Sequence, residues 1–247
     1  MPETFLILLA GGILLAAAIS NPRDVTLQWL RLGGITALSA CGLVAFFYFR
    51  REAVDRSALQ LGLFLATVAA ILGQLAFVQI AWRGTQRAFA WATFALAVAT
   101  GIEFIGAKWP AHIAVAGIAA MTGLTLMDML LGHAYLTAAK MTIAPFRRLN
   151  LGVSLVLLIR AICAVGITLI IQHYRPIEML WGIQGLYIGT RWFVGLLVPA
   201  VFFFMAHDCI KRRSTQSATG ILYVAGVLVF IGEIVALHLV QQTGLPF

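Results

Sequence analysis

The sequence predicts an all-α protein, a polytopic transmembrane helix bundle of about eight spans that forms one integral membrane domain over residues 1–247. Of its residues, 62% are hydrophobic and only 11% are charged, which leaves too little polar surface to cover a soluble globule. The apolar residues fall in runs of about 20, the helix length that crosses the hydrocarbon of a bilayer. These runs lack the two-residue alternation of barrel strands, so we expect helices.

The apolar runs follow one another along the chain with short connections. The first run is preceded by Glu3 and by no positively charged segment, so we expect a retained span rather than a signal peptide. We find no internal repeat in the sequence and no second domain. The expected spans are 4–20, 29–49, 59–82, 88–107, 111–136, 151–172, 185–207 and 221–240.

The basic residues between the spans predict the orientation in the membrane. One side holds the three arginines of "RREAVDR", Lys108 and Arg175, whereas the other holds Arg23, Arg31, Arg83, Arg87, Lys140, Arg147, Arg148, Lys211, Arg212 and Arg213. Positively charged connections stay on the cytoplasmic side. We therefore expect both termini outside, in a bacterial plasma membrane, although the three arginines between the second and third spans argue against this orientation.

Two connections are longer than tight turns. Residues 137–150 are basic and amphipathic, and we expect Pro145 to break the segment, which suits a cytoplasmic position at the membrane interface. Residues 173–185 mix aromatic residues with Arg175 and Glu178 and are expected along the outer interface. Each connection is either an interfacial anchor in contact with lipid or a docking surface for other membrane or peripheral protein subunits.

The net charge of +8 does not indicate nucleic acid, because the basic residues lie in short clusters between apolar runs. The cysteines Cys41, Cys163 and Cys209 are far apart and form no CxxC spacing, so no disulfide framework is implied. No signature of a soluble enzyme is present, including GxSxG, the P-loop and HExxH.

Five ionisable residues stand out inside the predicted spans, where charges are costly and usually have partners: Glu103, Asp128, Arg160, Arg191 and Glu233. Measured from the cytoplasmic end of each span, Arg191 lies at about 25 Å and Glu103 at about 22 Å, so we expect these two to pair. Arg160 lies at about 13 Å, between Asp128 at about 9 Å and Glu233 at about 18 Å, and can reach one or both carboxylates.

The buried charges have a functional and a structural interpretation. They can form a proton or ion path, a quinone pocket, or a site in which Arg160 and Arg191 bind the carboxylates of heme propionates or of a substrate. Alternatively, they are buried salt bridges that fix the register of the helices, since a buried pair alone is weak evidence for anything more.

All five histidines lie near a predicted membrane face. His133 and His207 end two spans on the cytoplasmic side, whereas His112, His173 and His238 are on the outer side. Two imidazoles at equal depth on neighbouring helices are what a heme b with two histidine ligands requires. We therefore consider His133 and His207 as ligands of a heme iron or as the borders of a quinone site, with the bland alternative that both are interfacial side chains.

Three functions remain open from the sequence. The first is an integral membrane subunit of an electron-transfer complex that holds a heme b or quinone and anchors redox partners, rather than an enzyme on its own. The second is a small-molecule or ion transporter, supported by the buried charges and by Pro199 in the seventh span but weakened by the lack of a repeat. The third is a non-catalytic structural subunit of a membrane complex.

Overall fold

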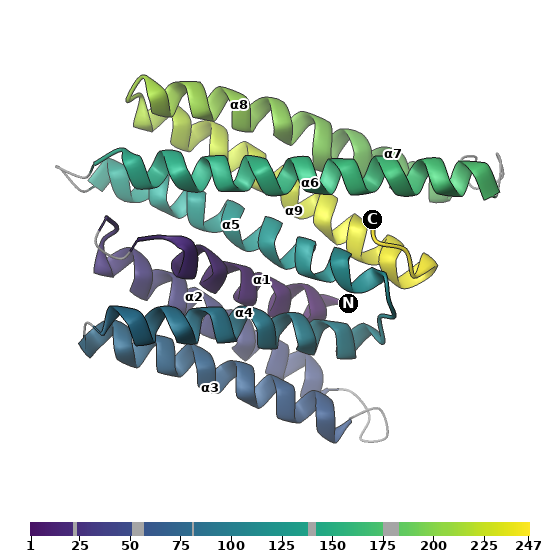
Figure 1. Ribbon diagram of the computed structural model, residues 1–247, viewed down its shortest axis with the longest axis horizontal. Helices are drawn as coiled ribbons and strands as arrows, with labels where there is room; N and C mark the ends of the chain where they lie inside the picture. Colours follow the sequence, from purple (N-terminus) through teal and green to yellow (C-terminus); the bar gives the residue numbers. More distant parts are fainter. Residues whose placement is uncertain (22–23, 51–56, 81, 138–141, 175–182) are drawn as a thin grey trace.

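A computed structural model describes residues 1–21, 24–50, 57–80, 82–137, 142–174 and 183–247 (Figure 1). The all-α prediction is confirmed, because the described chain is helical, has no strand, and contains eight helices long and apolar enough to span a membrane. The helices are α1 Pro2–Ile19, α2 Leu27–Phe49, α3 Ala58–Ile80, α4 Arg83–Ile105, α5 Ala111–Thr137, α6 Ala144–Tyr174, α7 Ile183–Trp192, the π-helix η2 Phe193–Leu197, α8 Val198–Lys211 and α9 Thr215–Thr243.

The bundle consists of two four-helix halves that repeat one packing order. In the first half α1 packs on α2, α2 on α3, α3 on α4, and α4 returns to α1. In the second half α5, α6, α8 and α9 form the same closed ring, and α1 and α5 join the halves at the centre (Figure 1). The structure therefore contains a parallel repeat that the sequence analysis missed.

The two halves meet at a glycine crossing. A Cβ atom added to Gly12 of α1 would lie 1.7 Å from the carbonyl oxygen of Ala119, and one added to Gly123 of α5 would lie 1.9 Å from the carbonyl carbon of Gly12. Small residues at membrane helix interfaces allow backbones to approach closely and gain van der Waals contact. The absence of a side chain at these two positions is therefore what allows α1 and α5 to pack together.

Several helices begin earlier than the hydropathy pattern predicts. The fourth begins at Arg83 rather than 88, the sixth at Ala144 rather than 151, and the last at Thr215 rather than 221. Hydropathy marks only the apolar part of a helix, whereas polar residues continue it beyond the hydrocarbon. Pro145 lies in the first turn of α6, where its missing N–H removes no helical hydrogen bond, so it does not break the segment as expected.

The seventh span changes helix type in its middle. The π-helix η2 separates α7 from α8, and Pro199 follows it in the first turn of α8. A proline ring clashes with the carbonyl group four residues earlier in an α-helix, and π-turns are a local way of accommodating such disruption. Within η2, Gly195 lies against Gly232 of α9, because a Cβ atom added to Gly195 would be 2.7 Å from the Gly232 Cα atom.

The glycine crossing generates a test of the architecture. We expect Gly12→Ala and Gly123→Ala each to lower the free energy of unfolding by about 1–3 kcal/mol or more, because an added methyl group overpacks the backbone contact. Gly62→Ala is the matched control, since an added Cβ atom there meets nothing within 4 Å. The measurement is unfolding of the purified protein in mixed micelles, and equal stability of all three variants would contradict the crossing.

Candidate functional site

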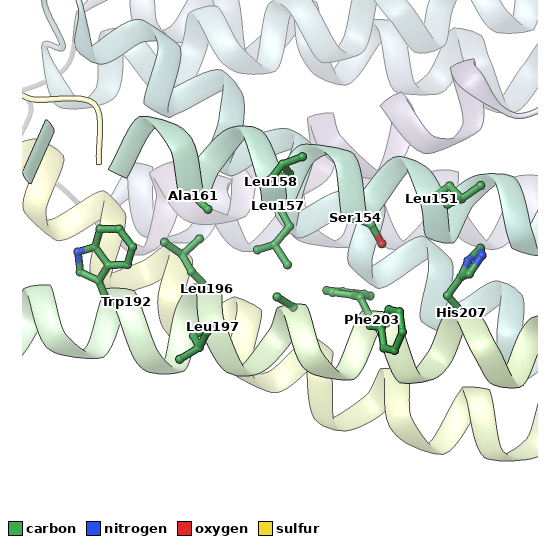
Figure 2. Close-up of a pocket in the computed structure, with 12 residues that line it drawn as sticks. Leu151, Ser154, Leu157, Leu158, Ala161, Trp192, Leu196, Leu197, Phe203 and His207 are labelled. Carbon is green, nitrogen blue, oxygen red and sulfur yellow. The ribbon is translucent and has the colours of Figure 1, made fainter. Parts of the chain in front are cut away.

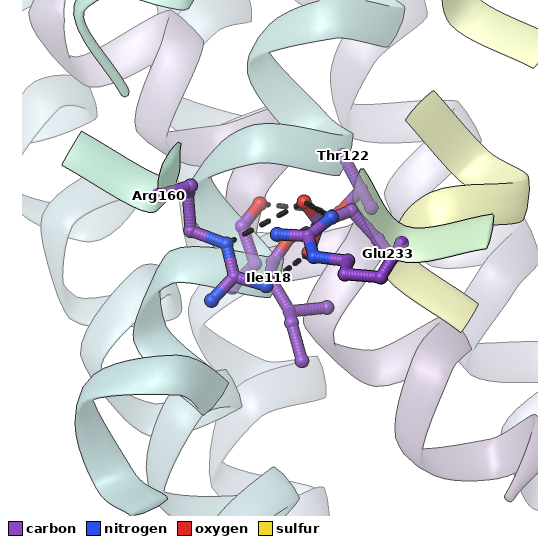
Figure 3. Close-up of polar contacts among 6 residues, drawn as sticks. Ile118, Thr122, Arg160 and Glu233 are labelled. Atoms are coloured by element: carbon purple, nitrogen blue, oxygen red, sulfur yellow. Dashed lines mark hydrogen bonds and ion pairs between the residues drawn. The ribbon is translucent and has the colours of Figure 1, made fainter. Parts of the chain in front are cut away.

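A buried cluster of two arginines and one glutamate ties three helices of the second half together (Figure 3). Arg160 of α6 donates from Nη2 to Oε2 of Glu233 on α9 at 2.5 Å, and from Nε to Oε1 at 3.5 Å. Arg191, in the last turn of α7, donates from Nη1 to Oε1 of the same carboxylate at 2.9 Å. We call Arg160, Arg191 and Glu233 the charged triad.

The charged triad is shielded from solvent and lipid. Arg191 and Glu233 have no exposed surface, and Arg160 is only 3% exposed. Glycines border the arginine side chains, since an added Cβ atom at Gly117 would lie 2.8 Å from Cδ of Arg160, and one at Gly195 would lie 3.1 Å from Nη1 of Arg191. The packing around the triad therefore depends on small residues in α5 and η2.

The expected pairing of Arg191 with Glu103 is wrong. Glu103 is exposed near the end of α4, in the other half of the bundle, so it does not belong to a buried network. Measured from the observed helix ends, Arg191 lies about 30 Å from Lys211 and Glu233 about 27 Å from Thr215, so these two residues share a depth. The predicted depths were misleading for two reasons. The predicted spans ended short of the observed helices, and depth alone does not say which helices are neighbours.

The structure does contain the expected ion pair between Arg160 and Glu233, but it gives Asp128 a different partner. Asp128 is fully buried on α5 and accepts a hydrogen bond at 3.0 Å from Nδ2 of Asn150 on α6. Its Oδ1 atom has no hydrogen-bond partner among the described residues. Asp128 and Asn150 therefore form a second polar contact between α5 and α6, separate from the charged triad.

A long apolar groove lies between α6 and the helices α7, η2 and α8 (Figure 2). Its volume is about 440 Å³, and Trp192 and His207, at opposite ends, are about 22 Å apart along the helix axis. The lining consists of Leu151, Ser154, Leu157, Leu158, Ala161, Trp192, Leu196, Leu197, Ala200, Phe203, Phe204 and His207. Leu158 and Leu197 are more than half exposed, so the groove opens toward the lipid side of the bundle.

The His207 end of the groove carries an imidazole and a hydroxyl, whereas at the other end the indole N–H of Trp192 is donated to Thr168 at 3.4 Å. The His207 ring is half-buried, and its Nδ1 atom has no hydrogen-bond partner among the described residues. Ser154, one turn from Leu151, lines the groove near this end and donates its hydroxyl to the carbonyl oxygen of Asn150 at 2.9 Å. The Ser154 oxygen can therefore still accept a hydrogen bond from a molecule in the groove.

The structure does not bring His133 and His207 to one pocket. His133 is exposed near the end of α5 and does not line the groove. His112 lies with Nε2 2.8 Å from the carbonyl oxygen of Ala107, and the His238 ring packs on Tyr187 with 4.7 Å between ring centroids. The side chain of His173 and the residues 175–182, which include Arg175 and Glu178, are outside what the structure describes, as is Lys140.

Sequence reasoning missed the groove and the partner of Arg191. The groove depends on how two consecutive spans pack against each other, which the sequence does not give, and its apolar lining resembles any other lipid-facing surface. Among the described residues, no three histidine, cysteine, aspartate or glutamate side chains gather as a metal site. The sequence indicated His207 as a candidate ligand because it ends a predicted span, whereas its position in an apolar groove is known only from the structure.

The fold and these contacts define the chain as a polytopic α-helical integral membrane protein, with a charged triad and a lipid-facing groove in its C-terminal half. Comparison with models of known families, with curated proteins and with solved structures finds no match.

The charged triad makes a prediction about stability. We expect Glu233→Gln to lower the free energy of unfolding by about 3–5 kcal/mol, because it leaves two arginines buried without their carboxylate. Arg191→Gln should cost less, since the Arg160 and Glu233 pair stays balanced. Glu103→Gln is the control and should be nearly silent because Glu103 is exposed. Denaturant titration of the purified variants is the measurement, and equal losses for Glu103→Gln and Glu233→Gln would contradict the assignment.

Proposed function

We propose that the protein is a quinone-binding membrane subunit of an electron-transfer complex, with the quinone in the groove between α6 and α8. The observation that supports this proposal is a long lipid-facing apolar groove with, at one end, the His207 Nδ1 atom, which has no hydrogen-bond partner among the described residues. A quinone has a flat head with two carbonyl oxygens that accept hydrogen bonds and a long apolar chain. Ligand sites typically combine an apolar lining with a few polar groups that fix orientation.

Each part of the quinone has a counterpart in the groove. The His207 ring supplies an N–H donor for a quinone carbonyl oxygen, and the Ser154 oxygen can accept from a quinol hydroxyl. The chain would lie along Leu157, Leu196 and Phe203 toward Trp192. The exposed side chains of Leu158 and Leu197 border the opening of the groove, through which a quinone dissolved in the bilayer can enter.

The same end of the groove suits the docking of a redox partner. Lys211, Arg212 and Arg213 follow His207 within two turns and are exposed. An exposed basic cluster attracts an acidic protein surface and increases the rate of encounter. We infer that a peripheral partner subunit with an acidic face exchanges electrons with the quinone at this end.

The quinone and heme content of the purified protein distinguishes the proposed function from the other candidate functions. A heme b between His133 and His207 stays a prediction, and an absorption spectrum before and after dithionite reduction tests it. The parallel repeat of the two halves favours a transporter as the second candidate, because many transporters contain such repeats. A wild-type protein that carries no quinone and no heme would favour transport or a structural role.

We predict that the protein purified from a quinone-containing bacterial membrane in mild detergent retains quinone. His207→Leu should lower the retained quinone about tenfold, the scale expected from loss of one hydrogen bond. Ala161→Trp should abolish retention, because the indole would fill the groove next to Leu157 and Leu196. The measurement is solvent extraction followed by chromatography, expressed as quinone per protein.

His133→Leu is the matched control for His207→Leu, since both remove a histidine near a helix end but only His207 lines the groove. It should leave quinone retention unchanged. Retention that survives both His207→Leu and Ala161→Trp would place the quinone elsewhere and overturn the proposed site.

We further propose that both termini lie outside a bacterial plasma membrane and that the α8–α9 connection is cytoplasmic. The basic residues around this connection support that orientation. In a variant without native cysteines, Gln216→Cys should react with a membrane-impermeant maleimide only after the cells are permeabilised. Gln242→Cys, near the end of α9, should react in intact cells, and the reverse pattern would invert the topology.

A further inference from the structure

The charged triad contains one more positive than negative group. Arginine stays protonated in proteins, so Arg160 and Arg191 contribute two charges against the one carboxylate of Glu233. All three residues are at least 97% buried, since Arg160 is 3% exposed and the other two are 0% exposed. A buried charge inside a membrane span is costly unless it is paired, so the triad favours one further negative group.

The two arginines donate to Glu233 from different parts of their guanidinium groups. Arg160 donates from Nε to Oε1 of Glu233 at 3.5 Å and from Nη2 to Oε2 at 2.5 Å. Arg191 uses only Nη1, and its own Nε and Nη2 atoms are buried without a hydrogen-bond partner among the described residues. The Nε and Nη2 edge is the fork that binds carboxylates with two parallel hydrogen bonds.

We propose that the Nε and Nη2 fork of Arg191 is a binding site for a monocarboxylate. One carboxylate neutralises the net charge of the triad and satisfies both free nitrogen atoms of Arg191. A carboxylate fits this fork better than a spherical ion, because its two oxygens match the two N–H groups. Arg191 does not line the quinone groove, so this site is independent of the proposed function.

The carboxylate can come from water as a small acid or from the bilayer as the head of an acyl chain. Both sources present the same group to Arg191. Formate is the probe for a small acid because it is the smallest carboxylate, and decanoate is the probe for an acyl-chain acid. Displacement of bound formate by low concentrations of decanoate identifies the membrane source, whereas failure to displace it identifies the aqueous one, and either result supports the site.

The test is equilibrium dialysis of radiolabelled formate and decanoate against the full chain in detergent. We expect wild-type protein to bind about one carboxylate saturably. Arg191→Gln should abolish binding, because it removes the fork and leaves the balanced pair of Arg160 and Glu233. Arg191→Lys retains the charge without the fork and should weaken binding roughly tenfold or more. Arg87→Gln, at an exposed arginine that donates to the carbonyl oxygen of Ala18 at 2.9 Å, should bind as wild type does.

Absence of saturable binding of both acids by wild-type protein would overturn the proposal, even if the Arg191 variants fail to fold. Binding by Arg191→Gln with wild-type affinity would also overturn it. Quinone retention is measured on separate samples of the same protein. Wild-type protein that retains quinone but binds neither formate nor decanoate would reject the carboxylate site and leave the proposed function standing. Loss of quinone with normal formate binding would reject only the proposed function.

Discussion

The carboxylate of Glu233 is the point on which the C-terminal half depends. It accepts hydrogen bonds from Arg160 on α6 and from Arg191 at the end of α7, and it belongs to α9. The two walls of the groove, α6 and the α7 to α8 span, are therefore both attached to one group. In a membrane the lipid provides no hydrophobic drive for helix association, so interhelical polar contacts and close packing of small residues have a larger part in holding the bundle together.

The two halves share a packing order but differ in their interiors. In the first half the buried acidic residue Glu3 lies at the start of α1, 3.6 Å from the amino group of Met1, whereas the helix interiors carry neutral groups such as the Thr67 and Thr100 hydroxyls, 3.2 Å apart, and the fully buried Gln74. In the second half the corresponding interior carries the charged triad and Asp128. The two halves therefore share a packing order, whereas the cluster of three buried charges and the groove belong to the second half.

Much of the fold could be predicted from the sequence because hydropathy and span length are strongly constrained by the bilayer. Arg160, Arg191 and Glu233 could also be selected, since charges inside spans are rare. Their pairing could not, because depth alone does not say which helices are neighbours, and Arg191 and Glu103 had similar depths on unrelated faces. The repeat could not be predicted for a similar reason. It is a repeat of helix contacts, and the amino-acid sequences around Gly12 and Gly123 have little else in common.

His133 and His207 occupy similar places at the ends of predicted spans. Only the packing shows that the His133 ring is exposed and that the His207 ring lines the groove.

The most direct measurement of the central claim, that the C-terminal half holds a quinone between α6 and α8, is photolabelling with an azido-quinone in native membranes followed by peptide mapping. We expect the label to attach to peptides from residues 151–161 of α6 and from residues 192–207, which run from the end of α7 through η2 into α8, and we expect excess unlabelled quinone to prevent this attachment. Labelling that is competed by quinone but lies on α1 to α4 would show that the quinone does not bind between α6 and α8.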